Sequence, residues 1–288
     1  MNTTELLKKI RKIEIKTRSL SQQIFAGQYH SAFKGRGMAF SEVRAYTYGD
    51  DVRFIDWNVT ARFKQPYVKV FEEERELTVM LLIDISSSTL FGTQSQFKQD
   101  LIAELAAVLS FSAITNNDKV GVIFFSDKVE KFIPPQKGKS HILMIISELL
   151  NFKPQSKTTN ISLALQYLTN AIKKKCTTFI ISDFINTDFK QALRIAGNKH
   201  DITALQVRDK GEYFLPNIGF LQIKDAESGN IHLINTSDKH LQKNSQMWWN
   251  DNEHALNDIF RQTNTDIIRL CTDEDYVPKL KEFFKKRS

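Results

Sequence analysis

A run of oxygen-bearing side chains directly follows the most apolar segment of the chain. The segment 77–83 is succeeded by Asp84, Ser86 and Ser88 in a D-x-S-x-S pattern. This spacing can turn three oxygen atoms toward one point, and ligands of open α/β sheets bind beyond the carboxyl ends of the strands. Carboxylate and hydroxyl oxygens are hard ligands that favour Mg²⁺, Mn²⁺ or Ca²⁺ over zinc. The pattern therefore predicts a site for one divalent cation.

Two further oxygen carriers stand where other connections of such a sheet would reach the same edge. Thr159 precedes an expected helix at Ile161, and Asp183 ends another apolar run. A Mg²⁺ site with few anionic ligands stays electrophilic and has room for one ligand from outside. We expect it to capture an Asp or Glu side chain of a partner protein. The alternative is that these residues only cap helices and end strands, which explains each residue but not their convergence.

The elements that must position these residues follow a regular α/β alternation from residue 77 onward. Apolar runs of strand length predict strands at 77–83, 120–125, 129–133, 177–182, 202–207 and 266–270. Helical periodicity predicts helices at 97–114, 141–150, 161–172, 189–196, 253–263 and 276–285. Short buried strands between helices predict an α/β fold, a mostly parallel sheet with helices on both faces. Residues 208–245 are predicted to be a β-rich insertion.

The first 76 residues have a different character. Residues 4–25 place Leu and Ile at helical spacing with Lys and Arg elsewhere, which predicts an amphipathic helix. We expect its apolar stripe to dock on the protein, although such a helix could also contact an anionic membrane surface. Residues 35–75 predict a loop-rich arm that leads into an extended run at 67–71. We divide the chain into residues 1–76, a basic helix and arm packed on the main domain, and 77–288, the α/β domain.

Charged side chains of this arm form a tentative partner-binding face: Arg44, Asp50, Asp51, Arg53, Asp56 and Arg62. The simpler interpretation is a buried or half-buried salt-bridge lattice that holds the arm on the sheet, with Trp57 as its apolar anchor.

A further hypothesis is a metal-dependent hydrolase or nuclease that uses Asp50, Asp51, Asp56 and Glu72–Glu74. Their spacing matches no two-metal pattern, and no histidine stands beside a plausible nucleophile. We therefore expect no catalytic residues and no enzymatic activity.

Composition excludes several classes of protein. The 288 residues are 41% hydrophobic and 25% charged, which is typical of a folded domain. Cys176 and Cys271 are the only cysteines, so neither a disulfide framework nor a structural zinc site is expected, and a reducing compartment fits best. The longest apolar run, Val79–Ile83, is far shorter than a membrane span, and the N-terminus lacks a signal peptide's apolar region. We expect a cytoplasmic protein.

The net charge of +7 is concentrated at one end of the chain. Residues 1–36 contain eight basic and two acidic residues, so +6 of the total belongs to them. Since the rest of the chain is nearly balanced, we expect no nucleic-acid partner, although a salt-sensitive contact of this segment with nucleic acid or membrane is an alternative. The G-x-x-x-x-G-K-[ST] motif is absent, so an ATPase partner would be a separate chain.

The D-x-S-x-S, threonine and aspartate groups together resemble the metal-ion-dependent adhesion site of von Willebrand factor A domains. That resemblance implies a Rossmann-like fold and assigns one cation to Asp84, Ser86, Ser88, Thr159 and Asp183. Thr159 is chosen over Thr158 because the run from Thr159 to Leu165 is similar to the Thr-x-hydrophobic-x-x-Ala-Leu run of that family. In the family, some of these residues bind the cation directly and others through water.

Several flanking segments narrow the resemblance: Gly37–Arg44, Tyr48–Arg53, Ile55–Arg62, Phe71–Arg75 and the Asp-x-x-Glu-x-x-Leu-Pro-x-x-Gly run from Asp209 to Gly219. They are similar to bacterial domain-of-unknown-function family fifty-eight, and the similarity extends from about Gly27 to the C-terminus. Members of that family are commonly encoded beside MoxR-type AAA+ ATPases. The resemblance implies a non-enzymatic, metal-dependent adaptor or co-chaperone that binds such an ATPase or its client.

Overall fold

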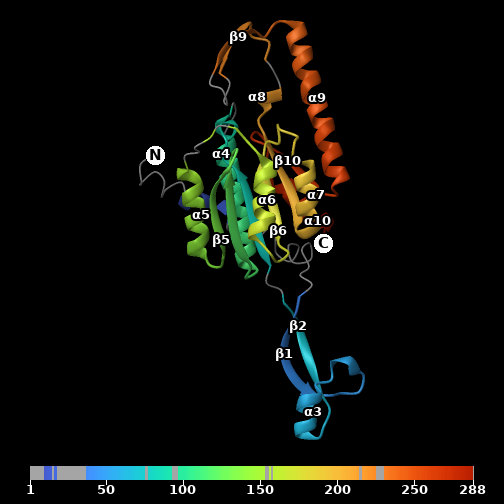
Figure 1. Ribbon diagram of the computed structural model, residues 1–288. Coiled ribbons are helices and arrows are strands. Elements are labelled where there is room, and N and C mark those ends of the chain that lie inside the picture. The colour runs from blue at the N-terminus through green and yellow to red at the C-terminus, as the bar shows by residue number, and fades with distance from the viewer. Residues whose placement is uncertain are drawn as a thin grey trace. The chain divides into compact units, whose positions relative to one another are not determined.

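The computed structural model describes residues 10–14, 16–17, 37–74, 77–92, 97–152, 156, 158–213, 216–224 and 230–287. Contacts divide the chain into two compact units (Figure 1). Residues 33–76 form the smaller unit, which we call the arm, and residues 1–32 with 77–288 form the larger one.

A six-stranded sheet with the order β10-β7-β6-β3-β4-β5 forms the centre of the larger unit. Its strands are β3 (Thr78–Asp84), β4 (Lys119–Phe125), β5 (Val129–Gln136), β6 (Thr177–Ser182), β7 (Asp201–Arg208) and β10 (Asp266–Cys271). All neighbours are parallel except the pair β4 and β5. The predicted mostly parallel sheet is confirmed. Strand β5 continues through Pro134 and Pro135, past the predicted end, because an edge strand tolerates proline.

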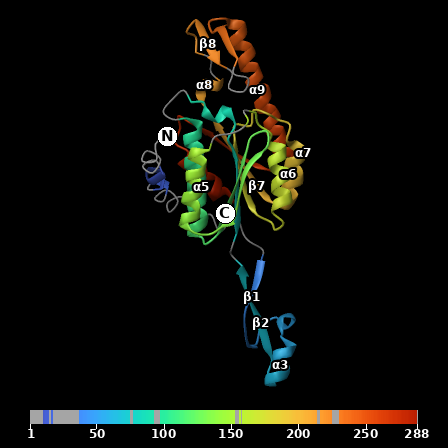
Figure 2. The same ribbon diagram turned by 60° about the vertical axis from the view of Figure 1, so that its left-hand side comes forward.

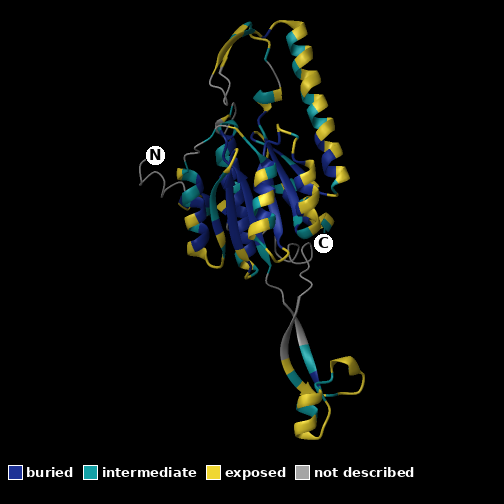
Figure 3. Cartoon of the chain, in the orientation of Figure 1, coloured by how far each residue is buried: buried dark blue, intermediate teal, exposed yellow. Residues whose placement is uncertain are grey.

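Helices cover both faces of this sheet (Figure 2). They are α4 (Lys98–Thr115), α5 (Lys139–Asn151), α6 (Ile161–Ala171), α7 (Lys190–Lys199) and α10 (Val277–Arg287), with a 3₁₀ turn η2 (Ser87–Leu90) before α4. Because side chains alternate across a strand, β3 and β6 feed two cores. Met80 and Leu82 pack with Leu165 of α6 and Leu193 of α7. On β6, Phe179 contacts the ring of Phe284 in α10. The strands are accordingly the most buried elements (Figure 3).

The predicted β-rich insertion differs from the expectation at its end. It contains α8 (Lys210–Tyr213), the antiparallel strands β8 (Phe220–Lys224) and β9 (Ile231–Asn235), and the start of α9 (Lys239–Gln262). Helix α9 begins well before the predicted Glu253, and only its C-terminal half joins the core, through Leu256, Ile259 and Phe260. The N-terminal half of α9 shows no helical spacing of apolar residues in the sequence, because the apolar residues in that half do not pack into the core. We call residues 210–213, 216–224 and 230–250 the appendage.

The arm is more regular than predicted. Strand β1 (Gly37–Ala45) pairs antiparallel with β2 (Tyr67–Glu74), and the 3₁₀ turn η1 (Val52–Phe54) and helix α3 (Trp57–Phe63) lie between them. The expectation of a loop at 37–45 is wrong. A β-bulge between Phe40 and Glu42 shifts the alternation of apolar residues, so that positions 38 and 40 are followed by 43 and 45. The bulge hides the two-residue period that identifies a strand.

Residues 10–14 and 16–17 are helical and contact α4 and α5 of the larger unit, to which they belong. Ile10, Ile13 and Thr17 are buried. Lys16 Nζ lies 2.6 Å from a Glu104 carboxylate oxygen of α4, and a Glu14 oxygen lies 2.5 Å from Lys139 Nζ of α5. The remainder of the predicted helix at 4–25 lies outside the described residues. No helix in the described part of the chain is both long and apolar enough to cross a bilayer.

A cysteine–histidine pair is buried where α7 meets the sheet. Cys176 Sγ lies 3.1 Å from His200 Nδ1, and both residues are almost fully buried. Burial raises the pKa of Cys176 to about 11 and lowers the pKa of His200 to about 4. Both groups are therefore neutral near pH 7, and the pair is a packing contact and not an activated thiolate.

The depressed pKa of His200 predicts a loss of stability in mild acid. The unfolded chain binds a proton near pH 6.5, but the folded chain does not until about pH 4, so the free energy of unfolding falls across that window. Relative to His200→Leu, the wild type should lose about 2–3 kcal/mol between pH 7 and 4.5 in urea titrations. The exposed His254, as His254→Leu, is the control. A difference between wild type and His200→Leu that is constant with pH would contradict the prediction.

Candidate metal centre

The predicted cation ligands come from the carboxyl ends of neighbouring strands. Asp84 is the last residue of β3, and Ser86 and Ser88 follow it. Asp183 follows β6, which pairs in parallel with β3, and Thr159 lies just before α6. Parallel neighbours end at the same edge of the sheet, so the chain brings all five residues to one place.

Hydroxyl and carboxylate oxygens meet at short distances at this edge. Ser86 Oγ lies 3.0 Å from Ser88 Oγ. Asp84 Oδ1 accepts hydrogen bonds from the backbone N–H of Ser86 at 2.9 Å and from Thr159 Oγ1 at 3.3 Å. Ser88, Thr159 and Asp183 line a cavity of roughly 320 Å³. The residues are therefore adjacent, and their role as cation ligands stays a prediction.

The electrostatics of the site suit a cation. Asp84 and Asp183 are both buried, and burial together with the charge of Asp183 raises the pKa of Asp84 to about 6. Ser182 Oγ donates to Asp84 Oδ2 at 2.7 Å and accepts from the Phe184 N–H at 3.2 Å, which fixes the carboxylate. Two desolvated carboxylates beside uncharged hydroxyls form a hard-oxygen donor set whose repulsion a divalent cation would relieve. The residues present fit such an ion.

A buried lysine completes the electrostatics of this edge. Lys98, the first residue of α4, is 1% exposed, and its Nζ lies 3.1 Å from Asp183 Oδ2 and 2.5 Å from Glu212 Oε1. Burial alone would lower the pKa of Lys98. The negative charges of Asp183 and Glu212 have the larger combined effect, so the pKa of Lys98 is raised. Burial also raises the pKa of Glu212. Lys98 thus joins a predicted cation ligand to helix α8 of the appendage.

Helix α8 is held at this position by its own short motif. Asp209 is fully buried, and its carboxylate accepts from the Gly211 N–H at 2.8 Å and from Thr272 Oγ1, just after β10, at 2.6 Å. Glu212 Oε2 accepts from the Asp209 N–H at 3.0 Å. The Asp-x-x-Glu spacing therefore positions Glu212 toward Lys98.

Sequence reasoning missed Lys98, Ser182 and Glu212. Glu212 stands in a motif that carries the family resemblance, but it was given no role. Ser182 immediately precedes Asp183, and a hydroxyl beside a predicted ligand was a usable signal. Lys98 gave none, because a lysine in the first turn of a helix is typically a surface residue.

The tentative partner-binding residues lie in the arm and are paired locally. Arg44 donates two hydrogen bonds of 2.7 Å to Asp50, and it holds the pKa of that carboxyl well below its usual range. Arg53 pairs with Asp51 at 2.6 Å. The carboxylate of Asp56 caps α3, and Arg62 in the last turn of that helix is exposed.

Within the arm the two aspartates are half-buried, their arginine partners are exposed, and Trp57 is 71% exposed. That this lattice holds the arm on the sheet, with Trp57 as its anchor, stays a prediction.

The alternative hydrolase site gains no support from these contacts. Asp50 and Asp51 each face an arginine, and Asp56 is engaged as a helix cap. The side chains of Glu72–Glu74 lie outside the described residues. Among the residues that are described, no three or more of His, Cys, Asp and Glu gather in a way that could hold a metal ion. The candidate centre at Asp84 is not such a group, because only two of its five proposed ligands are carboxylates and the other three are hydroxyl groups.

Comparison with known proteins agrees with this architecture. The family model described as "protein of unknown function DUF58" matches residues 42–254. The chain belongs to the DUF58 family. A relative named "uncharacterized protein Mb1516", from Mycobacterium bovis, is 28% identical over 223 residues, which are 76% of this DUF58 chain and 70% of the relative.

A solved structure supports the fold. BatB from Bacteroides thetaiotaomicron matches with a TM-score of 0.50 and 17% identity, over 73% of this chain and 98% of that chain. The SpRpn10 VWA domain matches with a TM-score of 0.39 and 10% identity, over 71% of this chain and 93% of that chain. The larger unit of this DUF58 protein has an α/β fold, with a mostly parallel sheet between two helical layers.

Proposed function

We propose that this DUF58 protein is a non-enzymatic protein-binding module that captures a partner's carboxylate through one divalent cation. Asp84, Ser86, Ser88, Thr159 and Asp183 would hold the ion, and Mg²⁺ is the expected metal. The observation that supports this most strongly is the convergence of these five residues at one edge of the sheet, where Asp183 lines the cavity and the buried carboxylate of Asp84 lies close to it. A von Willebrand A-like fold is consistent with a protein-interaction role.

The residues around the site provide rigidity and selectivity. Ser182 and the Ser86 N–H orient Asp84 before any ligand arrives, so little ordering is required on binding. Ile185 and Asn186 line the same cavity and are exposed, which gives the partner apolar and amide contacts beside its carboxylate. When bound, the cation would supply the electrophilic position that a carboxylate oxygen occupies.

For the partner we propose a MoxR-type AAA+ ATPase or a client of that ATPase, in the cytoplasm. The support is the family resemblance of the arm and domain motifs.

Neighbouring serines allow a matched test. Ser88 lines the cavity, whereas Ser87 does not and is similarly half-buried. We expect Ser88→Ala to weaken capture of the purified ATPase from the same host by roughly tenfold or more in Mg²⁺, and Ser87→Ala to leave it unchanged. The variants are preferable to chelation alone, because an ATPase also needs Mg²⁺ for its nucleotide. Equal capture by wild type and Ser88→Ala would contradict the metal-dependent mechanism.

A further inference from the structure

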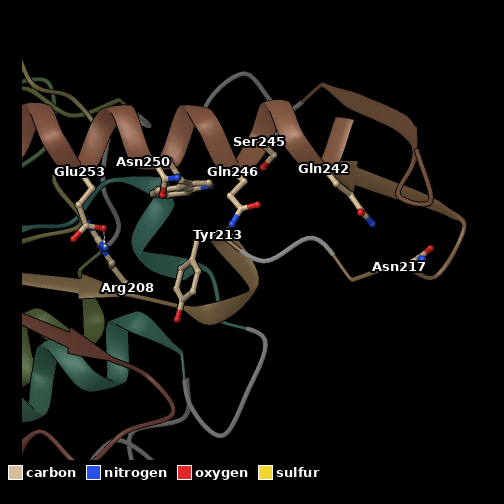
Figure 4. Close-up of a pocket in the computed structure, with 9 residues that line it drawn as sticks. Arg208, Tyr213, Asn217, Gln242, Ser245, Gln246, Asn250 and Glu253 are labelled. Atoms are coloured by element: carbon tan, nitrogen blue, oxygen red, sulfur yellow. Dashed lines mark hydrogen bonds and ion pairs between the residues drawn. The ribbon is translucent and has the colours of Figure 1, made fainter. Parts of the chain in front are cut away.

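A second recess, separate from the metal centre, lies between α9 and α8 of the appendage (Figure 4). It has a volume of roughly 640 Å³, twice that of the cavity at Ser88. One wall is a face of α9, and Tyr213 of α8 and Asn217 stand opposite. We call it the appendage cleft.

The α9 wall presents a row of amide side chains. Gln242, Gln246 and Asn250 line the cleft and are separated by four residues each. Four residues advance about 6 Å along a helix, and two residues of an extended chain advance about 6.6 Å. An amide side chain both donates and accepts, as a peptide group does. The row therefore matches every second peptide group of an extended chain laid along α9.

The amide side chains of the cleft keep donors and acceptors that a bound chain could use. Among the described residues, Gln246 and Asn250 make no side-chain hydrogen bond, and both are exposed. Gln242 uses its Nε2 to donate to Thr236 O at 2.7 Å and keeps its oxygen. Across the cleft, Asn217 Oδ1 accepts from Ser237 Oγ at 2.6 Å, which leaves its NH₂ group to donate.

The two charged residues that line the cleft are engaged within the protein. At one end Glu253 pairs with Arg208 at 3.0 Å and also with Arg269 at 3.1 Å. Tyr213 and Trp249 meet edge to face with ring centroids 6.5 Å apart and give the cleft an aromatic wall. Paired charges, an aromatic wall and amide groups that keep hydrogen-bonding capacity among the described residues suit a neutral polypeptide backbone.

Exposed apolar side chains are concentrated elsewhere on the appendage, outside the residues that line the cleft. Met247 and Trp248 of α9 are 52% and 50% exposed, and Phe220 and Leu233 of the hairpin are 73% and 70% exposed. A concentration of large apolar side chains in one exposed segment is typical of a protein-binding surface.

We propose that the appendage cleft binds an extended, uncharged peptide segment of a partner protein, through backbone hydrogen bonds to Gln242, Gln246 and Asn250. Main-chain recognition of this kind gives affinity with little dependence on side-chain identity. This inference goes beyond the proposed function, because it requires no cation and no partner carboxylate.

The test is a selection with a random dodecapeptide phage library on the immobilised full chain in EDTA. Enriched peptides are synthesised, and their affinity is measured by fluorescence polarisation. We expect the double variant Gln246→Ala/Asn250→Ala to bind about tenfold or more weakly. Asn244→Ala, an exposed amide on α9 outside the cleft, should bind as wild type does. Alanine favours the helix, and equal thermal unfolding of the variants verifies their folding.

A second experiment tests directly whether the peptide backbone is recognised. Methylation of alternate peptide nitrogens in an enriched peptide should abolish its binding, since it removes donors and leaves the side chains unchanged. Failure of the library to enrich any peptide over the double variant, or undiminished binding of the methylated peptide, would overturn the proposal. So would binding that is lost in Asp84→Asn, because the ligand would then depend on the residues of the metal centre.

Discussion

Replacing Lys98 with methionine is expected to lower the free energy of unfolding by about 3–5 kcal/mol. The side chain is 1% exposed and faces two carboxylates, Asp183 at 3.1 Å and Glu212 at 2.5 Å. Methionine fills most of the volume but leaves both carboxylates desolvated without a counter-charge. The cost of an unpaired buried charge, and not the loss of attraction as such, dominates this figure. Urea unfolding followed by far-ultraviolet circular dichroism, in EDTA, measures it.

Two further variants separate charge from packing at this position. Lys98→Met/Glu212→Gln should recover part of the lost stability, because it removes one of the two uncompensated carboxylates. Lys190 is also the first residue of a helix but is exposed, so Lys190→Met should change stability by less than about 0.5 kcal/mol. If Lys98→Met were as mild as Lys190→Met, or if the Glu212→Gln effect were simply additive, the cluster would not have the energetic role assigned to it.

The Lys98 cluster also marks the limit of what the amino-acid sequence could predict. The strands and the metal-centre residues follow from local patterns, since apolar runs mark buried strands and strand ends share one edge of the sheet. The contacts of Lys98 join residues 85 and 114 positions apart, and no local pattern encodes them. The bulge in β1 and the polar half of α9 were missed for a related reason. In both places the spacing of apolar residues that would identify a strand or a helix is interrupted. The cause is a β-bulge in β1 and the lack of core contacts in the first half of α9, and both depend on tertiary structure.

Lys98 changes what a divalent cation would meet at the sheet edge. The ammonium group already neutralises part of the charge of Asp183, so a cation bound at the proposed site would share Asp183 with Lys98. Glu212 would then carry a larger share of the Lys98 charge. Because Glu212 belongs to α8, metal binding would strengthen the Lys98–Glu212 ion pair, which joins the appendage to the rest of the larger unit.

Asp84→Asn is expected to change stability in opposite directions with and without Mg²⁺. Burial and Asp183 raise the pKa of Asp84 to about 6, so at pH 7.5 the ionised carboxylate destabilises the metal-free fold. The asparagine removes this charge, and the free energy of unfolding in EDTA should be unchanged or higher, by up to about 3 kcal/mol. A carboxylate with a raised pKa stabilises the fold below its ordinary pKa and loses that effect as the pH rises through 6. The advantage of the variant should therefore disappear toward pH 4.

In Mg²⁺ the order of stability reverses if the proposed site binds the ion. At a concentration about 100-fold above its dissociation constant, Mg²⁺ should stabilise the wild type by about 2.7 kcal/mol and Asp84→Asn by almost nothing. Asp118 is the matched control, since it is a fully buried carboxylate at the opposite end of β3, where it accepts from the Leu77 N–H at 2.8 Å. Asp118→Asn should keep the full Mg²⁺ response whatever its own stability. An Asp84→Asn protein that Mg²⁺ stabilises as much as the wild type would place the cation elsewhere, and the carboxylate-capture mechanism would have to be abandoned.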